Sequence, residues 1–411
     1  MSTPNIRFKG FSNAWEQRKL GDMGQFKNGM NFSKDAMDKG YPFVNLQNIF
    51  GKNIIETENL GLAEASDTQL KEYNLKQGDV LFVRSSVKLE GVGEAALVPK
   101  DLENTTYSGF VIRFRDESDM DSNFKRFIFG TKPIRNQIMA KATNSANKNI
   151  SQDVLNNLEL YVPTKEEQEK IGEYFSNLDN LITLHQRKCD ETKILKKYML
   201  KKMFPKNGED RPEIRFEGFS DAWEQCKLGD MVSFSKGSGY SKGDLKEDGT
   251  PIILYGRLYT KYETVISEVD TFVDEKKGSV FSKGGEVIVP ASGETAEDIS
   301  IASVVEKSGV LLGGDLNVIT PPDDMDSAFL AISISNGKPH NDMAKMAQGK
   351  SVVHLHNSDL EKIDLLYPCF EEQQRISGFF SNLDNLITLH QRKCGELKEM
   401  KQFMLQNMFP H

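Results

Sequence analysis

The sequence predicts an α+β fold in which two globular domains are joined by two long helices that pair antiparallel as a coiled coil. An internal repeat with pseudo-two-fold symmetry carries this prediction. Residues 175–189 (FSNLDNLITLHQRKC) recur unchanged at 380–394, and residues 6–23 recur with three differences at 214–231. The segments between the matches look unlike each other. We therefore expect a duplicated frame that carries two different inserts.

The layout sets the expected domain boundaries. A first globular domain, a first long helix, a second globular domain and a second long helix are expected at residues 1–164, 165–205, 206–370 and 371–411. Short apolar runs predict strands at residues 79–83, 95–98, 286–289 and 352–353, and residues 123–141 have helical periodicity. Mixed strands and helices of this kind are typical of an α+β domain.

Each long helix is free of internal proline and has one apolar stripe. Pro163 precedes the first helix and Pro205 follows it. About 38 residues at 1.5 Å each give a rod of roughly 57 Å, which needs a partner of similar length. The residues expected to pair the helices are Ile171, Phe175, Leu178 and Ile182 in the first helix, and Ile376, Phe380, Leu383 and Ile387 in the second.

Composition narrows the class of protein. The 411 residues suffice for two or three domains, and 38% hydrophobic with 27% charged residues is typical of soluble globular proteins. The four cysteines are far apart without a CxxC pair, and the chain starts without a signal peptide, so we expect a cytoplasmic protein with no membrane segment. A net charge of −8 argues against non-specific coating of nucleic acid, but it allows local basic surfaces.

No catalytic constellation is found in the sequence. Residues 347–351 look like the end of a phosphate loop but lack the required first glycine. His185 and Cys189 are four residues apart on one predicted helical face, as are His390 and Cys394, a spacing that could hold a metal ion. Polar packing that fixes the helix register is the preferred interpretation. We predict no catalytic residue and no metal site.

The first globular domain contains a local reversal of charge. Residues 123–152 have no acidic side chain but six basic ones, which suits contacts to phosphate; an ordinary solvated helix is the alternative. Loops rich in Asn, Ser and Lys can read base edges in a DNA groove. The residues of this domain expected to bind DNA are Lys27, Asn28, Asn31, Ser33, Lys34, Asn45, Gln47, Asn48, Arg84, Ser85, Lys88, Asn144, Asn147 and Lys148.

The second globular domain has different side chains at corresponding places. Its expected DNA-binding residues are Lys236, Ser238, Tyr240, Lys242, Tyr255, Arg257, Tyr259, Ser292, Glu294, Gln348, Lys350, Ser351 and His354. Each loop alone is weak evidence, since polar loops are usually only solvated. Unlike side chains at like positions nevertheless predict that the two domains read different sequences.

Together these features resemble the specificity subunit of type I restriction–modification enzymes, over essentially the whole chain. The resemblance rests on the segments RFKGF and WEQRKLGD near the start, on their copies in residues 215–230, and on the Glu-Glu-Gln and Leu-Asp-Asn-Leu-Ile sequences of both long helices. The sequences Gly78-Asp79-Val80 and Gly285-Glu286-Val287 also look like the start of a strand in the middle of the family's recognition domain.

The resemblance implies two target-recognition domains, each reading one half of an asymmetric, bipartite site in double-stranded DNA. It implies that the coiled coil fixes the gap between the half-sites and docks two modification (methyltransferase) subunits, which restriction (endonuclease and translocase) subunits then join. The chain itself would be non-catalytic and would hold no cofactor. The partner subunits would use S-adenosylmethionine, ATP and Mg²⁺, and would supply part of the phosphate clamp that an acidic chain lacks.

Two other functions remain open at this point. A coiled-coil scaffold whose two domains bind proteins would explain the long helices but not the basic, Asn-rich stretch before the first one. A nuclease acting alone would need a catalytic cluster that the sequence does not offer. The steep salt dependence expected of DNA binding distinguishes the first alternative, and an assay of the purified chain with metal and DNA distinguishes the second.

Overall fold

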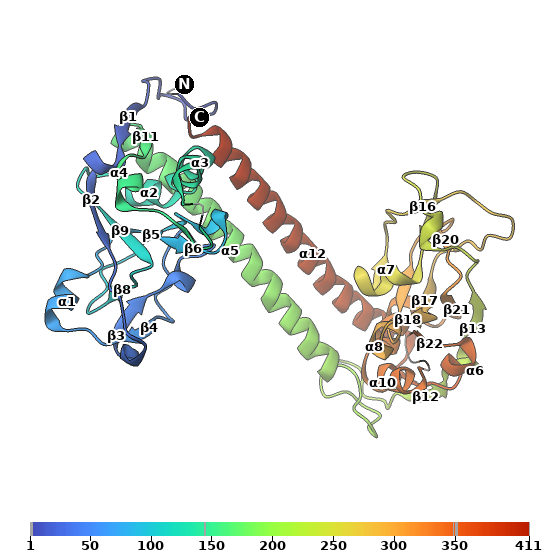
Figure 1. The fold of residues 1–411 in the computed structure, drawn as a ribbon. Helices are drawn as coiled ribbons and strands as arrows, with labels where there is room; N and C mark the ends of the chain where they lie inside the picture. Colours follow the sequence, from blue (N-terminus) through green and yellow to red (C-terminus); the bar gives the residue numbers. More distant parts are fainter. Residues whose placement is uncertain (1–2, 144, 348, 350–351, 411) are drawn as a thin grey trace. The chain divides into compact units, whose positions relative to one another are not determined.

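The computed structural model describes residues 3–143, 145–347, 349 and 352–410. The chain forms two compact units: unit 1 comprises Met1–His185 with Arg392–His411, and unit 2 comprises Gln186–Gln391. Each unit contains one globular domain together with a stretch of each long helix (Figure 1). The α+β fold class predicted from the sequence, with two long antiparallel helices, is confirmed. Each long helix thus contributes to both units.

The globular domain of unit 1 precedes the first long helix. In chain order its elements are β1 (Glu16–Lys19), β2 (Gly24–Asn28), β3 (Met37–Val44), β4 (Gly61–Ala63), α1 (Asp67–Glu72), β5 (Val80–Val83), β6 (Ser85–Ser86), β7 (Ala95–Leu97), β8 (Thr106–Tyr107), β9 (Val111–Asp116), α2 (Ser122–Ile128), α3 (Lys132–Lys141), β10 (Lys148–Asn149), α4 (Gln152–Asn156), β11 (Glu159–Val162) and α5 (Lys165–Lys202). The single helix expected at residues 123–141 is two helices, because Pro133 in the first turn of α3 begins a new helix.

Unit 2 contains the second globular domain and the start of the second long helix. Its elements are β12 (Glu224–Lys227), α6 (Leu228–Met231), β13 (Ser233–Lys236), β14 (Thr250–Ile253), α7 (Tyr255–Thr260), β15 (Val265–Ile266), β16 (Phe272–Val273), β17 (Glu286–Pro290), β18 (Ser292–Gly293), α8 (Ala296–Ile299), β19 (Ser303–Val305), β20 (Leu311–Leu312), β21 (Leu316–Thr320), α9 (Ser327–Ile334), α10 (Gly337–Met346), β22 (Val353–His354), α11 (Asn357–Leu360), β23 (Asp364–Tyr367) and α12 (Phe370–Asn407).

The two globular domains share one topology. Among the described residues of unit 1, strands are ordered β2-β9-β5-β7 and β4-β3-β8, with short ribbons β1-β11 and β6-β10. The described part of unit 2 repeats this as β13-β21-β17-β19 and β16-β14-β20, with ribbons β12-β23 and β18-β22, and adds β15 at the edge of the larger sheet. The sequence did not reveal this identity of fold between two segments that look unlike each other.

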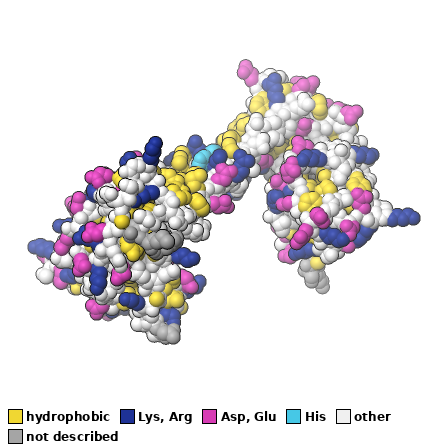
Figure 2. Space-filling view, turned by 90° about the horizontal axis from the view of Figure 1, so that it is seen from above, with side chains coloured by type: hydrophobic (Ala, Val, Ile, Leu, Met, Phe, Trp, Pro, Cys, Tyr) yellow, Lys and Arg dark blue, Asp and Glu magenta, His cyan; other side chains and the backbone are white. Residues whose placement is uncertain are grey.

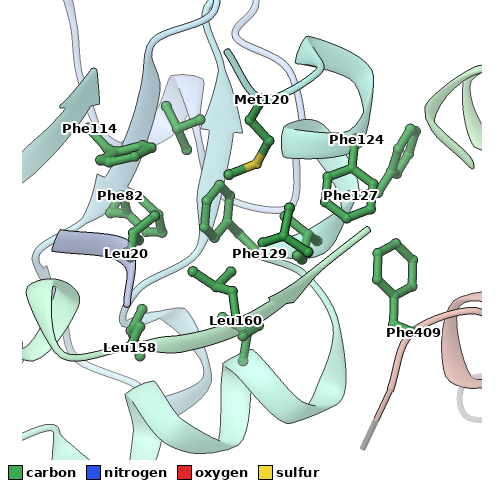
Figure 3. Close-up of a cluster of buried hydrophobic side chains, with 14 of the residues drawn as sticks. Leu20, Phe82, Phe114, Met120, Phe124, Phe127, Phe129, Leu158, Leu160 and Phe409 are labelled. Atoms are coloured by element: carbon green, nitrogen blue, oxygen red, sulfur yellow. The ribbon is translucent and has the colours of Figure 1, made fainter. Parts of the chain in front are cut away.

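The central strand of each larger sheet is buried on both faces. Side chains alternate along a strand, so Val80 and Phe82 of β5 enter one apolar core, whereas Leu81 and Val83 enter another. The first of these cores also includes residues of α2, β11 and α5, and Phe409 near the C-terminus (Figure 3). In unit 2, β17 divides its residues between two cores in the same way.

The long helices run antiparallel within each unit. In unit 1, the ring of Phe175 on α5 stacks on Phe409, which follows α12, while Asp179 forms an ion pair with Lys401. Unit 2 repeats the arrangement with its own residues: Phe380 lies against Phe204, and Asp384 accepts a hydrogen bond from Lys196 (2.5 Å). In both units, the C-terminal end of one long helix therefore packs into the globular domain that precedes the other long helix.

A buried ion pair ties the start of each domain to its long helix. Glu167 is fully buried and accepts two hydrogen bonds from the guanidinium of Arg7 (2.6 and 2.7 Å). Glu372 and Arg215 repeat this contact in unit 2 at 2.7 Å for both bonds. The hydrogen bond that Arg7 donates to Glu167 raises the pKa of Arg7. The arginines lie in the repeated segment at the start of each domain, and the glutamates lie in the Glu-Glu-Gln sequence that both long helices share. The ion pair is therefore one structural reason for the repeat.

None of the helices in the described part of the chain is both long enough and apolar enough to cross a membrane.

Candidate nucleic-acid interface

A short ribbon brings the polar loops of unit 1 together. β6 pairs antiparallel with β10, which places Ser85 opposite Asn149. Ser86 lies opposite Lys148 in the same ribbon. The backbone N–H of Arg84 donates to a carbonyl of the β8–β9 loop (2.8 Å). Two loops that the sequence predicted to bind DNA, one after β5 and one before α4, therefore lie side by side.

The loop after β2 joins this cluster. The N–H of Gly109 donates to the carbonyl of Met30 (2.7 Å), which fixes the β2–β3 loop against the β8–β9 loop. A β-carbon on Gly109 would lie 2.1 Å from the side-chain oxygen of Asn31, so a larger residue here would displace that side chain. The exposed side chains of Ser33 and Lys34 follow in the same loop.

Two exposed apolar side chains accompany these polar groups. A surface hollow of about 520 Å³ is lined by Ser85, Lys88, Asn147 and Phe110 among others. Phe110 is 58% exposed, and the neighbouring Val87 is 77% exposed. Neither residue was predicted as a DNA contact, because the prediction rested on polar side chains in loops. The signal that could have found Phe110 is its place between a Ser-Gly turn and a buried strand.

Three residues predicted to bind DNA in unit 1 are used within the fold. Asn45 and Asn48 cap the same short 3₁₀ turn reciprocally: the side chain of Asn45 accepts from the following N–H (2.8 Å), and that of Asn48 accepts from the N–H of Asn45 (2.9 Å). Asn48 is buried, so its assignment as a DNA contact is wrong. Lys27 forms an ion pair with Glu72 (2.7 Å) and lies over the ring of Tyr73.

The remaining predicted residues of this domain differ in exposure. The exposed ones are Asn31, Ser33, Lys34, Gln47, Lys88 and Asn147. The half-buried ones are Asn28, Arg84, Ser85 and Lys148. Asn144 lies outside the described residues.

The basic stretch at residues 123–152 is not a continuous cationic face. Lys125 is buried with Asp116 (3.2 Å), and Arg126 pairs with Asp179 of α5 (2.7 Å). Arg135 donates to a backbone carbonyl (2.6 Å). Burial lowers the pKa of Arg126 and of Arg135. These three cations hold the domain together, which corrects the expectation that they face phosphate.

Unit 2 has the equivalent ribbon with other side chains. β18 pairs with β22, so that Ser292 lies opposite His354, and the Ser292 hydroxyl is 3.0 Å from Nδ1 of His354. Glu294 follows β18 and is exposed. The rings of Tyr255 and Tyr259 on α7 lie 6.2 Å apart. Burial raises the pKa of Tyr259, and the nearby Tyr255 and Glu294 add to the effect.

Two predicted contacts of unit 2 are structural instead. The hydroxyl of the buried Tyr240 hydrogen-bonds to that of Ser279 (2.6 Å). Arg257 is held by Asp270 (2.5 Å) and Glu263 (2.7 Å) and leaves only 8% of its side chain exposed. Both groups are held inside the domain by these contacts.

The other predicted residues of unit 2 vary in exposure. Lys236, Lys242, Glu294 and His354 are exposed; Ser238, Tyr255 and Tyr259 are half-buried; Ser292 is buried. Burial of Ser292 corrects its assignment as a direct contact and makes it a support for His354. Gln348, Lys350 and Ser351 lie outside the described residues.

The two loop clusters therefore differ in charge. The unit 1 cluster contains the basic side chains of Arg84, Lys88 and Lys148, whereas the unit 2 cluster presents Glu294 and His354 at the corresponding ribbon. Basic and acidic side chains are interspersed over the face shown in Figure 2. Local charge of this kind fits a protein with a net charge of −8.

The residues predicted to pair the long helices have a double role. Ile171, Phe175, Leu178, Ile376, Phe380 and Leu383 are buried, and Ile182 and Ile387 are half-buried. Phe175 contacts Phe127 of its own domain (5.3 Å between ring centroids) as well as Phe409 (6.0 Å). The stripe thus joins helix to domain as much as helix to helix.

Cys189 and Cys394, the cysteines of the long helices, are not part of a metal-binding cluster among the described residues. No three His, Cys, Asp or Glu side chains among the described residues are arranged to hold a metal ion. All four cysteines are free thiols. Sγ of the buried Cys189 lies 4.0 Å from the carbonyl of Ile387 on the opposite helix.

Both halves of the chain match one protein family. Residues 13–193 and 220–399 match the family described as the type I restriction modification DNA specificity domain. A putative type I restriction enzyme MjaX specificity subunit of Methanocaldococcus jannaschii is 22% identical over 407 residues, which covers 94% of this chain and 91% of that protein. The EcoKI specificity subunit of Escherichia coli K12 is 26% identical over 163 residues, or 38% of this chain and 35% of that protein.

Solved structures share the fold. The type I restriction-modification system S subunit from M. genitalium has a TM-score of 0.63 at 15% identity, covering 100% of this chain and 99% of that one. A chain from a study of complex assembly and conformational transition of the type I R-M system has a TM-score of 0.52 at 17% identity, covering 96% and 97%.

Proposed function

The chain belongs to the family of type I restriction-modification DNA specificity proteins, and from this premise we propose that it determines which DNA sequence such a complex recognises. Each globular domain reads one half of a bipartite, asymmetric site in double-stranded DNA. The paired long helices, 38 residues each, set the gap between the half-sites. The chain works in the cytoplasm and carries out no chemistry itself.

One observation supports two independent readers more than any other. The ribbons β6-β10 and β18-β22 occupy the same place in two domains of the same topology. The first carries Ser85 and Lys148, and the second carries Ser292 and His354. Base edges are distinguished by the pattern of donors and acceptors that meets them, so different side chains at one structural position select different bases.

The partner subunits supply the chemistry in this proposal. Two modification subunits bring S-adenosylmethionine for methylation, and restriction subunits bring ATP and Mg²⁺ for translocation and cleavage. The partners also supply positive charge for the DNA backbone, because the loops of unit 2 offer little of it. In this division of labour the chain binds DNA and its partners, and it needs no cofactor.

An exposed apolar surface on the long helices supports the docking of two modification subunits. Unit 1 presents the exposed residues Leu181, Leu184, Met400 and Phe403, which we call the unit 1 patch. Unit 2 presents Leu386, Leu389, Leu195 and Tyr198, the unit 2 patch, at positions that correspond one to one at an offset of 205 residues. Large apolar side chains that recur on an exposed face mark an interaction site. Two equivalent patches fit two copies of one partner.

Charged substitutions in the patches test the docking. The double variant Leu181→Lys/Leu184→Lys should lose one modification subunit and retain the other, and Leu386→Lys/Leu389→Lys should do the same. Native mass spectrometry of the assembled complex gives the stoichiometry. Full assembly of the variant with all four leucines replaced would exclude this surface as the docking site.

Mapping of methylated adenine tests the proposed function itself. The chain is expressed with a cognate modification subunit in a methylation-free host, and single-molecule sequencing locates the modified bases. We expect a new split motif with a fixed gap that is absent without this chain. No new methylation, in a complex shown to assemble, would favour a scaffold that binds proteins.

Exchange of one domain tests the division into two readers. Replacement of residues 24–164 by the recognition domain of another family member should change one half of the methylated motif and leave the other half intact. Changes in both halves, or in neither, would contradict the modular reading.

A further inference from the structure

The recognition loops of unit 2 contain histidine, whereas those of unit 1 do not. Residues 1–184 of the sequence include no histidine at all. His354 lies on β22, and His356 follows two residues later; both are exposed. Their rings are parallel to within 2°, with centroids 6.5 Å apart. Histidine is the side chain whose ordinary charge change falls between about pH 5 and pH 8.

The ring of His354 is held by a buried hydroxyl. Ser292 lies opposite His354 in the β18-β22 ribbon, and its Oγ is 3.0 Å from Nδ1 of the imidazole. Ser292 is itself only 8% exposed, so its position is fixed by the domain. With Nδ1 engaged, Nε2 is the ring nitrogen left to meet a ligand. When the ring is protonated, both nitrogens are donors.

The same place in unit 1 carries groups that do not titrate near neutrality. There Ser85 lies opposite Asn149, and Ser86 lies opposite Lys148. An amide and a lysine ammonium keep their states between about pH 5 and pH 8. Of the two ribbons, that of unit 2 is the one that carries a type of side chain whose ordinary charge change falls in this range.

The surroundings of the two histidines are mostly acidic. Glu294 follows β18, and the adjacent helix α8 carries Glu297 and Asp298. Asp359 of α11 faces the His356 backbone, to which it is hydrogen-bonded (3.1 Å). Among the described residues, the cations near these elements are Lys236 at the end of β13 and Lys362, which pairs with Asp359 (3.5 Å). A protonated imidazole at the position of His354 adds positive charge beside the carboxylates named above.

We propose that His354, positioned by Ser292, contacts the second half-site of the DNA through Nε2 and makes recognition of that half-site pH-dependent. The protonated ring donates a charge-assisted hydrogen bond to an acceptor on the DNA. Recognition of the first half-site does not change over the same pH range. This inference rests on the proposed function and concerns the chemistry of one of its two sites.

The test uses the full chain with its modification subunits and a fluorescent duplex that carries the split motif found by methylation mapping. Fluorescence anisotropy measures Kd between about pH 6 and pH 8 at constant ionic strength. We expect wild-type affinity to fall roughly tenfold as pH rises over this range, the scale of one hydrogen bond to a charged group. His354→Gln should remove most of this dependence. Lys88→Gln, the matched control in unit 1, should weaken binding by the same factor at every pH.

Ser292 provides a second measurement of the same contact. Ser292→Ala should flatten the pH profile without abolishing binding, because the imidazole is present but no longer held. Ser292→Thr keeps a hydroxyl at this position and should restore the profile. Trp223 fluorescence reports whether unit 2 remains folded in each variant.

A duplex with a scrambled second half-site identifies the acceptor. A pH response that survives scrambling places the contact on the DNA backbone, and a response that disappears places it on a base edge; both outcomes support a DNA contact by His354. A His354→Gln variant that keeps the full pH dependence on the intact motif overturns the inference and leaves the proposed function standing. Failure of the wild-type complex to bind any split motif would instead overturn the proposed function.

Discussion

The two units differ where they face solvent and agree where domain meets helix. In unit 1 the start of the domain is tied to α5 by Arg7 and Glu167, and in unit 2 the corresponding contact is made by Arg215 and Glu372. The loops on the β6-β10 and β18-β22 ribbons, in contrast, have little in common but their position. Anchoring therefore needs particular residues, whereas the fold of each domain needs only alternating burial and turns at the right places. That difference leaves the loops free to diverge.

One anchor is not equal in the two units. The carboxylates of Asp179 and Asp384 both receive a lysine from the opposite helix. Asp179 also pairs with Arg126 (2.7 Å), whereas Asp384 receives only a hydroxyl from its domain, that of Thr264 (2.9 Å). A charged partner binds a carboxylate more strongly than a hydroxyl does. At this position, the globular domain of unit 1 thus has an ionic contact to its helix where unit 2 has a neutral one.

The largest expected effect tests whether the Arg7–Glu167 and Arg215–Glu372 ion pairs stabilise their units equally. Glu167→Gln and Glu372→Gln should each lower the free energy of unfolding of their unit by about 3–5 kcal/mol, because each leaves a largely buried arginine without its charge partner. Chemical denaturation measures this, with Trp223→Phe and Trp15→Phe backgrounds to report on unit 1 and unit 2 separately.

The exposed neighbours of these glutamates provide the controls. Glu166→Gln and Glu371→Gln make the same chemical change one residue away and should alter stability by less than about 0.5 kcal/mol. Loss of stability in only one of the two units would show that the repeated anchors are not equivalent.

A smaller effect should distinguish the aromatic contacts at the C-terminal ends of the two long helices. Phe409 is buried among Trp15, Phe124 and Phe175, whereas Phe204 is half-buried in the matching place of unit 2. Phe409→Ala should therefore cost about 3 kcal/mol and Phe204→Ala about 1–2 kcal/mol. Thermal unfolding followed by tryptophan fluorescence compares them. Equal losses would mean that the exposed part of Phe204 is covered in solution.

The unequal aspartates predict a further difference. Asp179→Asn should destabilise unit 1 by about 2 kcal/mol, and Asp384→Asn should destabilise unit 2 by about 1 kcal/mol, since the first removes two charged partners and the second removes one. Hydrogen exchange of the helix segments in each unit measures the change locally. An Arg126→Ala/Asp179→Asn double variant should show less than the sum of the single losses, because the two residues share one contact.

The long helices and the start of each domain were predictable because these segments occur twice in the sequence. Identical segments, an apolar stripe and the absence of internal proline predicted the long helices. The common topology of the inserts was not predictable in this way, since most of their strands have only two to five residues and so carry little pattern, and the two inserts pair them with different side chains.

The candidate site was predicted only in part, for a reason that applies to any polar loop. The loops predicted at Arg84–Lys88 and Ser292–Glu294 lie on corresponding ribbons of the two domains, but residue type alone does not show whether a side chain is used within the fold. Asn48, Tyr240 and Arg257 had suitable chemistry and are consumed by internal hydrogen bonds and ion pairs. Burial and partners become visible only in three dimensions.

The smallest effect concerns the charge of the two loop clusters and returns to the difference between them. Replacement of Glu294 by lysine gives the unit 2 ribbon a cation of the kind that Lys88 supplies in unit 1. Each phosphate contact contributes a slope of about −0.9 to the dependence of log K on log salt concentration. Glu294→Lys should therefore steepen the slope by about one and strengthen binding by about 1 kcal/mol or less, and Lys88→Ala should make the slope shallower by about one. Anisotropy titrations of the split-motif duplex at a series of KCl concentrations measure both.

Glu173→Lys on α5 makes the same change in net charge away from the loops, so an equal response from that control would assign the effect to the overall field of the protein rather than to a contact at the ribbon.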